Sequence, residues 1–265
     1  MLTNRMHFLS AVATIWHREL LRYWRDKTRI TSTLVQPLMF LAIFGVGLRR
    51  TLAGGSLGVD FILFMYPGIL AISVMNVAFF STISTVWDRE FGFLKEILVA
   101  PISRTAIALG KTFGAMTVAS IQAFALLVLA PVVHLTLAAR IIPAVLLVLL
   151  VVAFTIAGLG LLMASLMRTT ESFGLVMQLL VFPMFFLSGA FFPLTAVPRW
   201  MAVIAHLDPL IYGVDALRQL LLQHQVAAIT IQQFALYPVS IDLLILFGFS
   251  CVMICAAVAA FNRTS

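Results

Sequence analysis

Long stretches of chain without a charged residue constrain this sequence more than any other feature. Residues 112–139 and 141–167, for example, are separated only by Arg140. A helix needs roughly 20 apolar residues to cross about 30 Å of hydrocarbon, and a charged side chain near the bilayer centre is costly. Hydrophobic residues make up 62% of the chain and charged residues 10%, whereas soluble domains carry about 25% charged residues. The sequence therefore predicts an integral membrane protein.

Six of the charge-free runs are apolar enough to span a membrane as helices. The expected fold is an all-α membrane protein with six transmembrane helices, in a single domain over residues 1–265. A seventh run, 219–241, contains His224 and several Gln residues, so we expect it to lie outside the bilayer core. The predicted spans are about 30–48, 62–86, 107–133, 141–166, 172–192 and 241–261.

The Lys and Arg residues indicate how these spans are oriented, because cytoplasmic loops carry an excess of them. If the N-terminus is cytoplasmic, twelve of the 17 Lys and Arg residues fall on the cytoplasmic side and five on the other. An even number of spans then returns the C-terminus to the same side. We expect both termini in the cytoplasm, with the basic residues attracting anionic membrane lipid and no nucleic acid.

The sequence has no pattern typical of a catalytic, metal or cofactor site. Its five His residues are scattered, and Gly110-Lys111-Thr112 lacks the earlier Gly that a phosphate-binding loop needs. Lys111 is predicted to extend from a cytoplasmic helix end toward the interface. Asp88 and Asp242 are expected at span ends, which would leave no buried group able to hold a proton. Energy for uphill transport would then enter from a cytoplasmic partner, while sodium coupling through neutral ligands stays open.

Residues 11–29 are predicted to form an amphipathic helix in the cytoplasmic interface. Trp16 and Trp24 belong to an apolar stripe with i, i+4 spacing, and basic side chains line the opposite face. A simple basic anchor that sets topology would show the same charges. The residues assigned to this interfacial helix are Trp16, Arg18, Arg22, Trp24 and Arg25.

A second amphipathic segment, 88–104, joins the second and third spans on the cytoplasmic side. Its four large apolar residues share one helical face, and Pro101 should end the helix. We expect a short helix that is rigidly continuous with the two spans and can act as a lever. A helix that only rests on lipid would show the same periodicity. The apolar residues are Phe91, Leu94, Ile97 and Leu98.

Three blocks of sequence together resemble the type 2 ABC exporter permeases. They are the run from Arg89 to Arg104, the aromatic block from Phe182 to Met201 and the block from Asp208 to Arg218. In order and spacing, these blocks match the family over nearly the whole chain. Phe93 departs from the pattern, since family members often have a small polar residue there.

The resemblance implies a permease that forms a homodimer and carries two ABC ATPase subunits on its cytoplasmic face. ATP and Mg would bind to those separate chains, so this chain would bind no cofactor and would not itself be an enzyme. It would lie in a bacterial cytoplasmic (inner) membrane. On this reading, a cytoplasmic gating helix couples the ATPase to the spans through Glu90, Phe91, Gly92, Leu94, Ile97, Leu98 and Pro101.

Gly and Pro residues interrupt the chain at the predicted outer end of the fifth span. Backbone groups freed at membrane depth need partners, and external re-entrant helices within 194–222 would supply them; an ordinary amphipathic loop is the alternative. Asp215 and Arg218 could pair across one helical turn. The residues assigned to this external gate are Pro193, Pro198, Trp200, Pro209, Tyr212, Asp215 and Arg218.

The translocation path is predicted from polar and aromatic side chains in the second and fifth spans. Asn76 is the strongest candidate, because an amide in hydrocarbon needs a partner or water. Helix packing explains most of the others equally well. The path candidates are Asn76, Phe80, Phe182, Phe185 and Phe186.

The predicted function is export of an amphipathic or hydrophobic substrate, such as a drug, lipid or glycolipid, by a permease that a separate ATPase drives. A polysaccharide-exporting permease is the first alternative. A carrier that works without an ATPase would favour buried ionisable groups or broken helices at the midplane. A membrane enzyme such as a lipid transferase would need convergent polar groups, and the sequence shows neither pattern.

Overall fold

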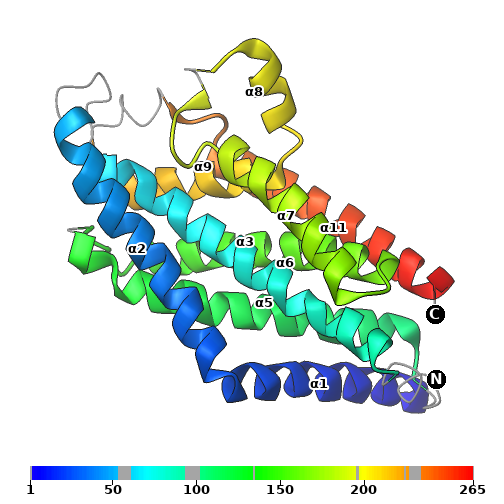
Figure 1. The fold of residues 1–265 in the computed structure, drawn as a ribbon. Coiled ribbons are helices and arrows are strands. Elements are labelled where there is room, and N and C mark those ends of the chain that lie inside the picture. Colours follow the sequence, from blue (N-terminus) through cyan, green and yellow to red (C-terminus); the bar gives the residue numbers. More distant parts are fainter. Residues whose placement is uncertain are drawn as a thin grey trace.

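The computed structural model describes residues 2–52, 61–92, 102–133, 135–194, 197–223, 225–226 and 234–264. Every regular element in these ranges is a helix, which confirms the all-α prediction (Figure 1). The elements are α1 (Leu2–Arg25), α2 (Lys27–Leu52), α3 (Phe61–Glu90), α5 (Arg104–Val128), the 3-10 helix η1 (Ala130–Val133), α6 (Ile142–Leu166), α7 (Thr170–Leu187), α8 (Arg199–Ala205), α9 (Pro209–Leu222) and α11 (Val239–Thr264).

Polar side chains fix where several of these helices begin. Ser103 at the start of α5 and Thr169 at the start of α7 each accept a hydrogen bond from a backbone N–H group in the first turn, which satisfies a donor that the helix itself leaves free. Asp208 does the same for α9, and Pro209 follows it at a position where its missing N–H is not needed. The third and fifth predicted spans therefore start a few residues earlier than hydropathy alone suggested.

Five helices are long and apolar enough to cross a membrane, namely α3, α5, α6, α7 and most of α11. They lie where the second to sixth spans were predicted, and the first predicted span, 30–48, lies within α2. The short helices α8 and α9 are bent by 92° relative to each other and could count as one further span by length and composition. Figure 1 shows α8 at the end of the bundle away from both termini.

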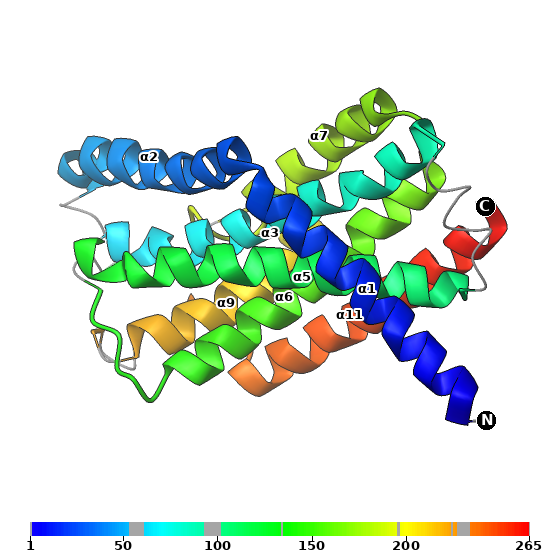
Figure 2. The ribbon, with the colours of Figure 1, turned by 90° about the horizontal axis from the view of Figure 1, so that it is seen from below.

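α3 is the central helix of the bundle. It packs against α5, α6 and α9 and also touches α2 and α7 (Figures 1 and 2). Glycines in α6 allow close approach on two sides: a Cβ added at Gly160 would lie 2.7 Å from Thr82 Oγ1 of α3, and one at Gly158 would lie 2.9 Å from Ile254 Cγ1 of α11. Small residues favour such contacts in membranes, where close van der Waals packing holds helices together.

α1 lies across the bundle rather than along it (Figure 2), and it packs mainly on α5. Its buried face consists of Ile15, Glu19 and Tyr23, which recur every four residues. Trp16 also reaches the bundle, because its Nε1 donates a hydrogen bond to Thr117 Oγ1 of α5 at 3.0 Å. α1 is therefore docked on protein as well as amphipathic.

The predicted interfacial helix, 11–29, is wrong at its end. α1 ends at Arg25, and Lys27 begins α2. The cause is local, since Asp26 Oδ1 accepts a hydrogen bond from the backbone N–H of Arg29 at 3.0 Å and so acts as the start signal of a new helix.

The chain after α3 also differs from the expected lever. α3 ends at Glu90, and Gly92 has φ of 78°, a left-handed conformation that glycine adopts at little cost. The chain thus turns at Gly92, and the prediction of a helix rigidly continuous with the second span is wrong at this point. The other residues assigned to the gating helix, Leu94, Ile97, Leu98 and Pro101, lie outside the described residues.

The close contact between α6 and α3 makes Gly160 sensitive to added volume. We expect Gly160→Ala to lower the thermal unfolding temperature of the detergent-solubilised chain by several degrees, because overpacking costs about 1–3 kcal/mol. Gly174→Ala in α7 is the matched control, since no atom lies within 4 Å of an added Cβ there, and it should be neutral or slightly stabilising. Equal effects of the two substitutions would contradict this packing.

Candidate functional site

A buried cluster of charged side chains joins α1, α3 and α5. Lys111 Nζ of α5 lies 2.6 Å from Asp88 Oδ2 of α3 and 3.4 Å from Glu19 Oε1 of α1. Ser84 Oγ lies 3.3 Å from the same nitrogen. The Lys111 side chain is 1% exposed, so its charge depends on these partners rather than on water.

Arg18 completes this cluster from the edge. Its Nη2 lies 2.7 Å from Asp88 Oδ2 and 2.9 Å from Glu19 Oε1. Two cations and two carboxylates thus share one site, and their charges cancel. Burial is tolerated when each charge is paired and hydrogen-bonded, whereas removing one partner leaves a costly uncompensated charge.

The cluster alters the acidity of Glu19. Burial by itself would raise the pKa of this carboxyl, but the Lys111 ammonium and the Arg18 guanidinium outweigh it and hold the pKa below the ordinary value of 4.5. A carboxyl whose pKa is lowered by folding stabilises the folded state above its unfolded pKa. That contribution is lost as the pH falls through the lower folded value.

Two glycines explain how α1 approaches closely enough to form this cluster. A Cβ added at Gly110 would lie 2.8 Å from Ile15 Cβ, and one at Gly114 would lie 2.7 Å from Glu19 Cβ. The segment Gly110-Lys111-Thr112 therefore has a packing and ion-pairing role. The prediction that Lys111 extends toward the interface is wrong, because the cluster offers it two carboxylates inside the protein.

The end of α3 is bound to the turn between α6 and α7. Arg89 Nη1 donates to the carbonyl oxygens of Ser165 and Met167 at 2.8 and 2.7 Å. Glu90 Oε2 accepts a hydrogen bond from the Thr170 backbone N–H at 3.0 Å. The next residue, Phe91, is 79% exposed. A push on this end of α3 would therefore reach α6 and α7 directly.

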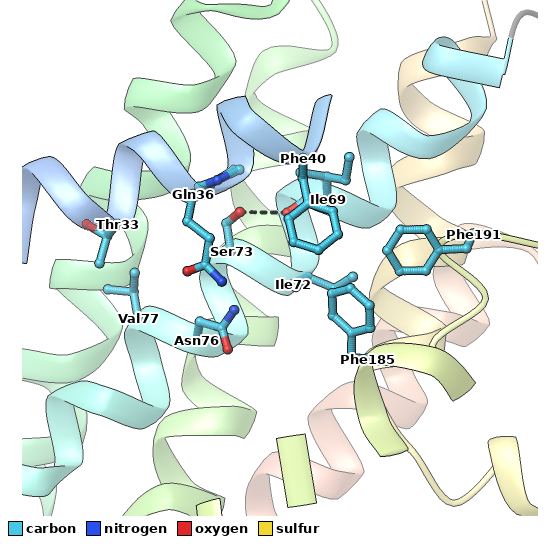
Figure 3. A pocket seen from close by; sticks show the side chains of 11 residues that line it. Thr33, Gln36, Phe40, Ile69, Ile72, Ser73, Asn76, Val77, Phe185 and Phe191 are labelled. Carbon is cyan, nitrogen blue, oxygen red and sulfur yellow. Dashed lines mark hydrogen bonds between the residues drawn. The ribbon is translucent and has the colours of Figure 1, made fainter. Parts of the chain in front are cut away.

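A pocket lies between α2, α3 and the outer end of α7. Figure 3 shows the side-chain amides of Gln36 and Asn76 at one side of it and the rings of Phe40, Phe185 and Phe191 at the other. Its volume is about 30 Å³, which is room for one or two water molecules, so in this conformation its side chains are closely packed. The structure thus brings the predicted path residues Asn76 and Phe185 into one pocket.

The other path candidates lie in two different places. Phe80 is 50% exposed and lines a second pocket that adjoins the first at Asn76. Phe182 and Phe186 stack edge to face with their centroids 4.9 Å apart and are 64% and 40% exposed. They therefore belong to the outer surface of α7 rather than to the pocket.

At the end of the bundle opposite the charged cluster, the two short helices α8 and α9 carry most of the residues assigned to the external gate. Pro198 precedes α8, Pro209 begins α9, and the Tyr212 hydroxyl donates to the His206 carbonyl at 2.9 Å. Trp200 is 66% exposed. Pro193 lies in the connection between α7 and α8.

The expected pairing of Asp215 with Arg218 is wrong. Arg218 Nη2 donates to the Gly189 carbonyl at 2.7 Å, and its guanidinium lies 4.0 Å from the centroid of the Phe64 ring. Asp215 Oδ2 instead accepts from the backbone N–H of Leu236 at 2.8 Å. The two side chains still attract each other electrostatically, but each makes its shortest hydrogen bond to a backbone group of another segment.

Asp215 also lies beside a second buried acid. Gln219 Nε2 donates to Asp215 Oδ2 at 3.1 Å and to Asp242 Oδ2 at 3.4 Å, so it bridges the two carboxyls. Asp242 is 0% exposed. Asp88 and Asp242 do lie at helix ends, as expected, but both are buried, so the expectation that no acid is buried is wrong.

The sequence matches the family model described as ABC-2 type transporter over residues 10–222. The chain belongs to the ABC-2 type transporter family. This range includes the charged cluster, the pocket and the external helices. The chain is thus the transport permease of an ABC transporter, a multi-pass membrane protein, and its family implies association with an ABC ATPase subunit.

Individual relatives agree with this assignment of an ABC-2 permease. The transport permease ycf38 of Cyanophora paradoxa is 29% identical over 216 residues, which cover 80% of this chain and 74% of the relative. The inner membrane transport permease YadH of Escherichia coli K12 is 28% identical over 216 residues, covering 78% and 81%. Nodulation protein J of Rhizobium leguminosarum is 28% identical over 217 residues, covering 80% and 83%.

Two residues of these sites in the ABC-2 permease, Glu19 and Gln36, were not predicted from the sequence. Glu19 was not singled out, although it is the one acid on a basic helix and lies on the same face as Ile15 and Tyr23. Gln36 was noted only for its place beside Pro37, and its position opposite Asn76 depends on how α2 packs. In the described part of the chain, no group of three or more His, Cys, Asp or Glu side chains could hold a metal ion.

The charged cluster predicts a large penalty for removing its buried cation. Lys111→Met should lower the thermal stability of the solubilised permease by roughly 3–5 kcal/mol, because the two buried carboxylates would lose their buried cation and keep only Arg18 and, for Asp88, the more distant Arg22. Arg22→Gln is the control, since Arg22 is 42% exposed and lies 3.9 Å from Asp88 Oδ1; it should cost less than about 1 kcal/mol. A Lys111→Met protein as stable as the parent would refute the role of the cluster.

The acid pair predicts different responses to two similar substitutions. Asp215 Oδ2 accepts hydrogen bonds from the backbone N–H groups of Leu236 and Tyr237 and from Gln219 Nε2, whereas Asp242 Oδ2 accepts one from Gln219 Nε2. Asp242→Asn should change the unfolding temperature little, because the amide oxygen can accept the same hydrogen bond. Asp215→Asn should lower it clearly, since hydrogen bonds to a charged group contribute about 1.5–3 kcal/mol. Thermal unfolding of both variants checks this order, and the reverse order would contradict it.

Proposed function

We propose that this chain is the permease subunit of an ATP-driven exporter, which moves an amphipathic or hydrophobic substrate out across a bacterial cytoplasmic membrane. Two permease copies would form a homodimer and carry two ATPase subunits that bind ATP and Mg. Both termini would be cytoplasmic, in line with their position at the same end of the bundle in Figure 1.

The observation that carries this proposal is the linkage at the end of α3. Glu90 and Arg89 hold the turn between α6 and α7, and Asp88 is joined to α1 and α5 through the charged cluster. Phe91 protrudes from the same place. A partner that binds Phe91 would therefore act on α1, α5, α6 and α7 together, as coupling to ATPase closure requires.

The proposed cargo follows from the pocket between α2, α3 and α7. Its amide and aromatic sides would suit a molecule with both polar and apolar parts. Because α3 carries Asn76 in this pocket and Glu90 at its end, movement of α3 would alter the pocket. The external helices α8 and α9 would close the outer end of the path through Arg218 and the Gly189 carbonyl.

A carrier that works without an ATPase is a second candidate, and the buried acids Asp215 and Asp242 favour it. Carriers that use protons place ionisable groups inside the membrane. The two functions differ in a simple experiment. Vesicles that contain only this polypeptide would accumulate a substrate along an imposed proton gradient if it were such a carrier, whereas the ATP-driven exporter would need its partner and nucleotide.

The contact at Phe91 can be tested by copurification of the tagged chain with its ATPase. Phe91→Glu should reduce the recovered ATPase at least several-fold, because an exposed apolar contact would become charged. Arg140→Glu, at an exposed position of the opposite end, should leave recovery unchanged. Glu90→Gln should retain the partner but weaken substrate-stimulated ATP hydrolysis. Unchanged recovery with Phe91→Glu would show that the assigned contact is wrong.

A further inference from the structure

Arg29, at the start of α2, is a half-buried cation that Asp26 attracts electrostatically without a direct ion pair. Its Nη2 donates to Ser81 Oγ at 2.9 Å, and its guanidinium lies 5.9 Å from the centroid of the Tyr23 ring. Within the described residues, no carboxylate forms an ion pair with it. Asp26 is near in sequence, but its Oδ1 accepts the backbone N–H of Arg29 instead.

This guanidinium lies at one end of a groove between α2 and α3. Arg29, Ser32 and Thr33 belong to the α2 side, and Phe80 and Trp87 belong to the α3 side. The groove has a volume of about 310 Å³. It adjoins the pocket of Figure 3 through three shared lining residues, Thr33, Gln36 and Asn76.

The groove combines three kinds of side chain. A cation lies at the Arg29 end beside Asp26, hydroxyl and amide groups follow at Thr33, Gln36 and Asn76, and Phe80, Ile83 and Trp87 supply an apolar wall. A ligand that satisfies all three parts has an anionic head, a short polar region and an apolar tail.

The charges around the Arg29 end are unevenly balanced. Asp88 and Glu19 are already neutralised by Lys111 and Arg18 in the charged cluster. Arg22 lies 4.7 Å from the centroid of the Trp87 ring, which closes this end of the groove. The exposed side chain of Arg25 lines the adjacent cleft, which also reaches Trp87. Asp26 lines the groove beside Arg29 and partly offsets its charge, and Arg22 Nη1 is 3.9 Å from Asp88 Oδ1, so Arg29 and Arg25 leave a net positive charge at this end.

We propose that this groove binds a single-tailed or lipid-like amphiphile with a phosphate or carboxylate head, and that Arg29 recognises the head. The proposal rests on the proposed transport function and names its substrate class. A guanidinium offers a planar fork of donors that matches both anions, and such charge-assisted hydrogen bonds are short and strong. The apolar tail would lie against Phe80 and Ile83.

A free anion fits the groove less well than an amphiphile does. The Asp26 carboxylate shares the Arg29 end of the groove, and most of its other walls are aromatic, aliphatic, hydroxyl- or amide-bearing, so a free anion would meet one guanidinium and little else. Apolar burial of the tail would supply the rest of the affinity, at about 0.8 kcal/mol for each buried CH₂ group.

The test measures binding to the full chain in phosphatidylcholine nanodiscs by titration calorimetry. The probes share one tail: dodecyl phosphate is anionic, dodecyl maltoside is neutral and dodecyltrimethylammonium is cationic. Arg29→Gln should weaken dodecyl phosphate binding about ten-fold or more and leave dodecyl maltoside unchanged. Arg29→Lys should lose less, because the charge remains. The exposed Arg140→Gln is the matched control and should bind all probes as the parent does.

A second variant keeps the test decisive if Arg29→Gln does not fold. Asn76→Asp places a carboxylate inside the same groove, so it should weaken binding of dodecyl phosphate and strengthen binding of dodecyltrimethylammonium. Inorganic phosphate should compete with dodecyl phosphate only at far higher concentration.

Three results would overturn the proposal. They are equal affinity of parent and Arg29→Gln for dodecyl phosphate, no reversal of charge preference in Asn76→Asp, and inorganic phosphate binding as tightly as dodecyl phosphate. These outcomes are independent of copurification with the ATPase. If no ATPase is recovered but dodecyl phosphate still binds through Arg29, the exporter proposal is refuted. If the ATPase is recovered but Arg29 does not affect dodecyl phosphate binding, the ligand proposal is refuted.

Discussion

The ion pair between Lys111 and Asp88 is the interaction on which the rest of the structure depends. Both side chains are buried, and neither could remain charged there without the other. Glu19 and Arg18 complete the cluster, and they do so only because glycines in α5 let α1 approach. A helix that amphipathicity alone would leave at the interface is thereby fixed to two spans.

α3 links this cluster to every other feature of the molecule. Its last turn carries Asp88, Arg89 and Glu90, its middle carries Asn76 in the pocket, and its first turns carry Phe64 beneath the Arg218 guanidinium. Because α3 is packed on several sides, a displacement at one end cannot be absorbed locally. This geometry gives a physical basis for coupling between the end near α1 and the end near α8 and α9.

The number and positions of the helices were predictable from the sequence, because charges are excluded from the bilayer core and the charge-free runs are long. Local signals were also readable in part: Pro209 after Asp208 predicts the start of α9, and Pro198 predicts the start of α8. The sequence could not predict which side chains meet across helices. Lys111 and Glu19 are 92 residues apart, so no periodicity or spacing connects them. The same holds for Asn76 and Gln36, whose shared pocket depends on the crossing of α2 over α3.

By itself, the sequence determined that the chain is a multi-helical membrane protein with basic residues concentrated at one end, since transfer of charge into hydrocarbon is expensive for any fold. Only the tertiary structure decided which of its few charges are buried. Arg218 donates to a carbonyl oxygen, Asp215 accepts from backbone N–H groups, and Lys111 pairs with the buried Asp88. The physical reason is that a charged side chain far from water takes the partners that neighbouring helices bring to it, and those partners are set by packing rather than by distance along the chain.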